Sequence, residues 1–165
     1  MKQEINDAAR AQIRGYFRQL TMLFSVFLAS IFLFLISVMI AVYYQGPMDE
    51  AYGTYLLFGG PFSGLALLLM GSRLFRARLA TAKEGEKLFE KMDGYRAALV
   101  VRMLLLDGAA FIQLVAFVMT GNKLFIALAL VIATLFLFYR PTLEKFISEV
   151  ELSEVEAKVM RDHGA

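Results

Sequence analysis

Asp107 is the one carboxylate inside the long apolar runs of this sequence, and it is therefore the residue best placed to do chemistry. An ionised side chain at the centre of a membrane helix costs about 2.5–3.5 kcal/mol on insertion scales, so it normally has a partner or a function. Two roles fit. Asp107 could form a structural clasp, for which Arg73 or Arg140 on a neighbouring helix is the natural partner. Alternatively, it could carry a proton or an ion.

Arg102 and Gln113 are the polar residues that could act beside Asp107, because all three belong to one predicted helix. Counting back from Thr120 over the length of the following helix places Asp107 about 5 Å inside the inner boundary of the bilayer. Arg102 lies near that boundary, where its side chain can reach the headgroups. Since Arg102 and Asp107 are about 140° apart around the helix, we expect no direct pair. Gln113 lies about two turns nearer the outer face and is the second group that an ion pathway could use.

Composition excludes several other chemistries. The chain has no cysteine, which excludes disulfides, thiolate metal sites and cysteine-based redox chemistry. Its single histidine, His163, is third from the C-terminal end, so a haem held between helices by paired histidines is excluded. No cluster of acids, histidines or nucleophiles gathers near one predicted interface. We therefore predict no catalytic residue, no metal and no cofactor, and we expect that the protein is not an enzyme.

The predicted fold is all-α, a single membrane domain over residues 1–165. Hydrophobic residues make up 59% of the chain and the mean hydropathy is +0.60, against about 45–50% apolar residues in soluble domains. The excess lies in long uncharged runs, which predicts two transmembrane hairpins that form a four-helix bundle. The four predicted spans cover about 20–44, 54–71, 97–120 and 124–139. The predicted cytoplasmic segments, helical in large part, are 1–19, 72–96 and 140–165.

The distribution of basic residues predicts the orientation. Sixteen of the seventeen Lys and Arg lie on the side of the two termini, and the opposite loops hold only Lys123. Because Lys and Arg are retained on the cytoplasmic side, we expect a protein of the bacterial inner membrane with both termini in the cytoplasm. Tyrosines should mark the two interfaces with their polar tips in water. The inner set is Tyr16, Tyr95 and Tyr139, and the outer set is Tyr43, Tyr44, Tyr52 and Tyr55.

The first segment, 1–19, has an apolar face that includes Ile13, Tyr16 and Leu20, and arginines recur every four residues on another face. Two interpretations remain open. The segment could be a short helix that lies on the inner leaflet, with its arginines toward lipid headgroups. It could equally be an ordinary helical lead-in to the first span.

The second span contains Gly60 and Gly64, a GxxxG spacing that usually indicates close helix packing in membranes. Pro61 lies between them and removes a backbone hydrogen bond, so we expect a kink. Packing is one interpretation of this stretch, and a broken helix that builds a substrate site is the other. Beyond the membrane, the same helix is predicted to continue until the chain turns back at Gly94.

The C-terminal tail, 142–165, is predicted to form two short amphipathic helices. Ser153 and Glu156 have the spacing of a capping box at the start of the second one. The tail carries a net charge of −3 and the 72–96 segment +3. We expect the two to dock, mainly through apolar residues such as Phe146 and Ile147, with charge setting the orientation. Interleaved acidic residues in 72–96 make nucleic acid a poor partner.

Two resemblances bear on the chain. Residues 96–111, with Asp107-Gly108 before an apolar run, resemble the carboxylate helix of the ATP synthase proteolipid subunit c, which implies a proton carrier at Asp107. The preceding loop of about 25 residues and the two further spans depart from that family. As a whole the chain resembles a family of small bacterial inner-membrane proteins with four spans, which implies an architecture but no activity. The residues that carry this second resemblance are Tyr95-Arg96, Asp107-Gly108, Gly121-Asn122 and Arg140-Pro141-Thr142.

Two functions are compatible with this sequence. The first is a non-enzymatic scaffold or accessory subunit that acts through helix packing and its cytoplasmic face, with the lipid bilayer and a membrane protein or a second copy as partners. The alternative is a small transporter or channel subunit that uses Asp107 and Gln113 to pass protons or ions.

Overall fold

Helices make up the ordered elements of the computed structural model, which describes residues 2–48, 53–85 and 87–164. No strand occurs in this described part of the chain, so the all-α prediction is confirmed there. The helices are α1 (Lys2–Gln45), α2 (Gly53–Lys83), α3 (Leu88–Thr120), α4 (Leu124–Phe138), α5 (Leu143–Val150) and α6 (Glu154–Gly164).

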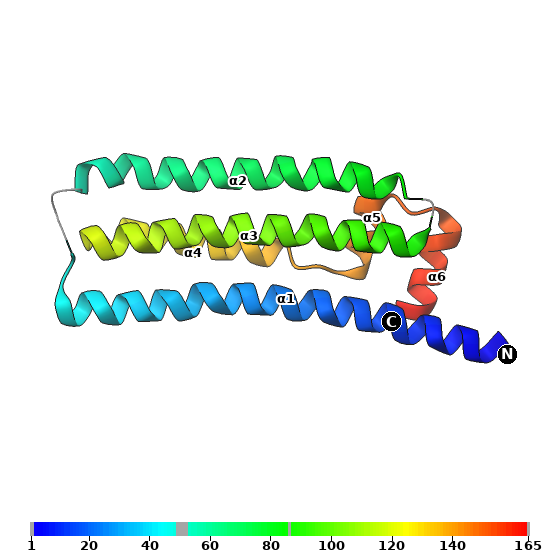
Figure 1. Ribbon diagram of the computed structural model, residues 1–165. Helices are drawn as coiled ribbons and strands as arrows, with labels where there is room; N and C mark the ends of the chain where they lie inside the picture. The colour runs from blue at the N-terminus through cyan, green and yellow to red at the C-terminus, as the bar shows by residue number, and fades with distance from the viewer. Residues whose placement is uncertain (1, 49–52, 86, 165) are drawn as a thin grey trace.

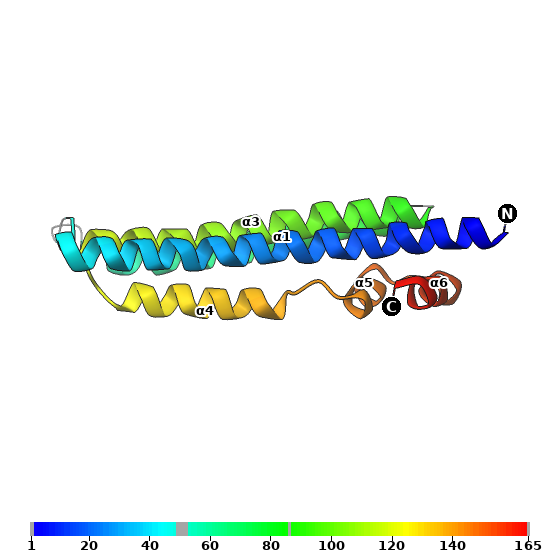
Figure 2. The ribbon, with the colours of Figure 1, turned by 90° about the horizontal axis from the view of Figure 1, so that it is seen from below.

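The helices form two layers. In the first layer α3 lies between α1 and α2 (Figure 1). The second layer consists of α4, α5 and α6 (Figure 2). As a result α3 packs against α1, α2 and α4, and it is the hub of the bundle. Both termini lie at the end of the bundle that also holds α5 and α6, which we call the charged end; the end where α1 finishes and α3 turns into α4 is the loop end.

Three helices are long and apolar enough to cross a membrane, namely α1 from Arg10 onward, α2 and α3. The predicted fourth span corresponds to α4, which has 15 residues and is only about 22 Å long. It meets the same test only together with α5, from which it is bent by 81°. The described structure therefore contains three candidate spans, or four if that bent pair counts as one.

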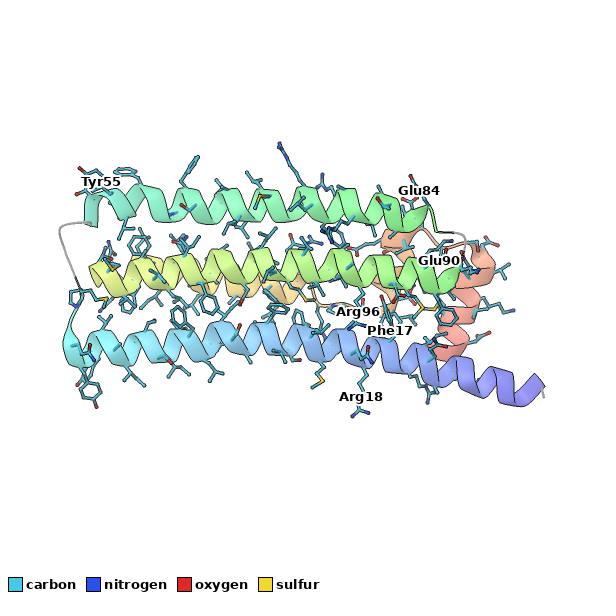
Figure 3. The ribbon with its side chains drawn as sticks, viewed as in Figure 1. Phe17, Arg18, Tyr55, Glu84, Glu90 and Arg96 are labelled. Atoms are coloured by element: carbon cyan, nitrogen blue, oxygen red, sulfur yellow. The ribbon has the colours of Figure 1, made fainter. Side chains whose placement is uncertain are left out.

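The N-terminal segment is continuous with the first span, because α1 runs unbroken over 44 residues. Its predicted apolar face is buried at Ile13, Tyr16 and Leu20. Arg18, on the other face, points away from the bundle (Figure 3). The apolar face packs against other helices of the same chain, which agrees with a helical lead-in and not with a separate helix on a lipid surface.

The turn between α2 and α3 lies earlier than predicted. Helix α2 ends at Lys83, where Gly85 N–H donates to Ala82 O, and α3 starts when Lys87 N–H donates to the Glu90 carboxylate. Gly94 is inside α3, so the predicted helix stop at Gly94 is wrong. A Cβ atom at Gly94 would lie only 2.5 Å from Ala82 Cβ, so this glycine allows α2 and α3 to approach closely.

The tail docks on the charged end through Phe146, whose side chain is fully buried. Its ring lies 5.0 Å from the Tyr95 ring, 6.0 Å from Phe17 and 6.3 Å from Tyr16, centre to centre. Apolar docking of the tail is therefore confirmed. The surface that receives it is broader than predicted, since α1 contributes Tyr16 and Phe17 in addition to the residues of α3.

Two ion pairs orient the tail as predicted from its charge. Lys83 Nζ lies 2.6 Å from Glu151 Oε1, and Lys91 Nζ lies 2.9 Å from Glu156 Oε1. The capping box is also present, because Ser153 N–H donates to the Glu156 carboxylate over 3.0 Å. Burial acts to raise the pKa of Glu156, but the hydrogen bonds from Lys91 and Ser153 outweigh it and hold this pKa below its usual range. This stabilisation is present above the usual carboxyl pKa and is lost as the pH falls through the lowered one.

Tyrosines occupy both ends of the bundle, but not all of their side chains are exposed. Tyr43, Tyr44 and Tyr55 are largely exposed at the loop end, as predicted, and Tyr52 lies outside the described residues. Tyr95 is buried at the charged end, where its hydroxyl donates to Glu149 over 2.8 Å. Tyr16 is also buried, and its hydroxyl donates to the Met92 carbonyl. These two side chains belong to the core, which corrects their assignment to a wet interface.

Candidate functional site

Asp107 is half-buried on the side of α3 that faces α1. Ser30 of α1 contacts it, with Ser30 Oγ 2.9 Å from Asp107 Oδ1. The same hydroxyl lies 2.7 Å from the Phe27 carbonyl. Because a hydroxyl has one proton, Ser30 shares it between the Asp107 carboxyl group and the Phe27 carbonyl. The Asp107–Ser30 pair joins the first helix to the hub helix.

The predicted arginine partners of Asp107 are wrong. Arg73 and Arg140 are exposed, and no ion pair between described residues involves Asp107. The reason is the rotation of α3 about its axis. Its Asp107 side faces α1, whereas Arg73 belongs to α2 and Arg140 follows α4.

Gln113 is the buried polar side chain of the described core, with 1% of its surface exposed. Its Nε2 donates to the Gly60 carbonyl of α2 over 2.7 Å. A Cβ atom at Gly64 would lie 2.5 Å from the same Nε2, so glycine is needed there for the amide to fit. Gly60 and Gly64 lie close to side chains of α3, which agrees with the packing interpretation, and α2 continues as one helix through Pro61.

Asp107 and Gln113 lie on different sides of α3. They are six residues apart, which is about 120° around a helix, and one contacts α1 whereas the other contacts α2. Since α3 itself stands between α1 and α2 in the first layer (Figure 1), these two polar groups do not meet in a common cavity. Each is used in a contact between two helices.

Arg102 is held between two aromatic rings. Its guanidinium carbon lies 3.4 Å from the centre of the Tyr139 ring and 4.5 Å from that of Phe75. The Nε atom is buried and has no hydrogen-bond acceptor among the described residues. As predicted, no direct pair with Asp107 forms between these described residues. Sequence reasoning missed this aromatic cage, although Phe75 and Tyr139 both fall near the predicted inner boundary.

Metal ligands do not cluster in the part of the chain that the structure describes, where no group of three or more His, Asp or Glu side chains could hold an ion. Comparison with models of protein families, with curated proteins and with solved structures finds no match for this chain.

Proposed function

We propose that this protein is a non-enzymatic membrane scaffold or accessory subunit of the bacterial inner membrane. In this proposal both termini lie in the cytoplasm, as the concentration of Lys and Arg at the charged end favours. The short α4 crosses as a fourth span, with local thinning of the bilayer to match its length. The partners are lipid and a membrane protein or a second copy, and not nucleic acid.

The observation that best supports this proposal is that Asp107 and Gln113, the polar groups between the helices, are both engaged in contacts between two helices. Asp107 is engaged with Ser30 and Gln113 with the Gly60 carbonyl, on different sides of the hub helix. Hydrogen bonds of this kind between membrane helices contribute about 0.6 kcal/mol on average and up to about 1.7. A transporter or channel subunit, the alternative function, would need polar groups that converge on one pathway. The arrangement favours a structural role for both residues.

The charged end supplies the surface through which a scaffold would act. It is a folded unit in which α1, α3 and the tail share one core around Phe146. Charged side chains cover its outside, among them Arg18 on α1 and Glu84 and Glu90 at the turn between α2 and α3 (Figure 3). A partner would therefore meet a pre-ordered polar surface whose shape depends on tail docking.

The test is co-purification of the full chain from native membranes in wild-type form and with Arg18→Glu, which changes only an exposed charge. A scaffold that acts through this surface is expected to retain a companion protein at a fixed ratio, and the substitution should reduce that ratio several-fold. Thr134→Ala, at an exposed site on α4, is the matched control and should leave it unchanged. A wild-type protein that is isolated with no companion and as a monomer would contradict the proposal.

A further inference from the structure

A cleft runs between α2 and α4 and is formed by two adjoining cavities. One has a volume of about 60 Å³ and is lined in part by Gly71, Ser72, Arg102 and Tyr139. The other has a volume of about 160 Å³ and is lined mainly by apolar side chains of the same two helices. Leu68 and Leu135 line both cavities, so the two lie side by side. Helix α4 belongs to the second layer (Figure 2). The cleft exists because α4 packs on α3 and makes little contact with α2.

The charged group of this cleft is Arg102, and it lies at one end. Arg102 is 18 residues from Thr120, which is about 27 Å along the helix and close to the thickness of a bilayer core, about 30 Å. In the proposed orientation its guanidinium is therefore at the level of the inner headgroups. The second cavity extends from it toward the middle of the membrane, to Pro61 and Gly64.

The Arg102 guanidinium is preorganised to bind an anion. Tyr139 and Phe75 hold it in position, so little side-chain entropy remains to be lost on binding. No described carboxylate forms an ion pair with it, and its Nε has no acceptor among the described residues. The planar donors of an arginine match the oxygens of a phosphate group. Arg73, next to Ser72 on α2, adds positive charge at the same level.

We propose that this cleft binds one phospholipid of the inner leaflet that has a net negative headgroup. The phosphate contacts Arg102, and one acyl chain lies along Leu68 and Leu135 toward Pro61. A lipid fits better than a free anion because an apolar cavity adjoins the charged one. An anionic headgroup is favoured because Arg102 forms no ion pair with a described carboxylate, and Arg73 adds a second cation. This assignment rests on the proposed insertion in the membrane and is independent of the scaffold role.

The experiment measures lipid retention by native mass spectrometry of the purified full chain, with phosphatidylglycerol and phosphatidylcholine as probes. Wild type is expected to retain one phosphatidylglycerol per chain in preference to phosphatidylcholine. Arg102→Gln should reduce that retention about tenfold or more, because a hydrogen bond to a charged group contributes about 1.5–3 kcal/mol. Lys158→Gln is the matched control, since Lys158 is exposed on α6, and it should retain lipid as wild type does.

A second variant keeps the proposal testable if Arg102→Gln fails to fold. Leu135→Trp fills the shared part of the cleft, leaves Arg102 in place, and should also reduce retention. Equal retention of the two lipids, or equal retention by Arg102→Gln and Lys158→Gln, would overturn the proposal. Displacement by inorganic phosphate at matched concentration would also overturn it, since the site would then be one for free anions. None of these outcomes predicts a change in the amount of companion protein that co-purifies with the chain. The lipid proposal and the scaffold proposal can therefore fail separately.

Discussion

Phe146→Ala is expected to release the C-terminal tail from the charged end. The side chain is fully buried among the rings of Tyr16, Phe17 and Tyr95, and truncation of a buried phenylalanine to alanine typically costs about 3–5 kcal/mol. The ion pairs of Lys83 and Lys91 are partly exposed and too weak to hold the tail alone. Limited proteolysis in detergent should therefore show much faster cleavage within residues 140–165.

Val155→Ala is the matched control for the tail, because it removes an apolar side chain of α6 that is 75% exposed. It should be cleaved at the wild-type rate. If Phe146→Ala, alone or combined with Ile147→Ala, left the protease sensitivity of the tail unchanged, the docked tail would be wrong.

Gly94→Val is expected to force α2 and α3 apart at the charged end. A Cβ atom at this position would lie 2.5 Å from Ala82 Cβ and 3.0 Å from Ala82 Cα. Because the second atom belongs to the backbone, it cannot move aside as a flexible side chain can. Overpacking of this kind costs about 1–3 kcal/mol or more, and the melting temperature in detergent should fall accordingly.

Gly15→Val is the control for the intrinsic effect of valine in a helix. Gly15 lies in α1, and an added Cβ would meet nothing within 4 Å. Valine has a slightly better helix propensity than glycine, so this variant should melt at or above the wild-type temperature. If Gly94→Val melted as high as Gly15→Val, the close approach of α2 and α3 at Ala82 would be contradicted.

The helices themselves could be predicted from the sequence, because their signals are local. Long uncharged runs predicted the apolar parts of α1, α2 and α3, and the predicted spans 97–120 and 124–139 placed the step from α3 to α4. The Gly60 and Gly64 spacing also predicted a packed face, since only small residues allow such an approach in a membrane.

Contacts that depend on helix rotation could not be predicted in the same way. A sequence fixes which residues share a face of α3, but the neighbours that each face meets depend on the packing of the whole bundle. For this reason Asp107 contacts Ser30, where an arginine was predicted. The two rings around Arg102 were not predicted for the same reason. The predicted turn at Gly94 was wrong because Gly85 and Gly94 both resemble a helix stop in the sequence. The packing of α2 against α3 decides between them: Gly85 follows the end of α2, whereas Gly94 lies inside α3.

The most direct test of a structural role for Asp107 combines proton flux and thermal stability. Wild-type protein in liposomes is expected to leak protons no faster than empty liposomes. Asp107→Ala, which loses the contact with Ser30, should lower the melting temperature by an amount that corresponds to about 0.6–1.7 kcal/mol. Asp107→Asn keeps an acceptor for the Ser30 hydroxyl and should melt close to wild type. Proton flux that depends on the wild-type protein and disappears in a stably folded Asp107→Asn variant would contradict the account and establish a carrier.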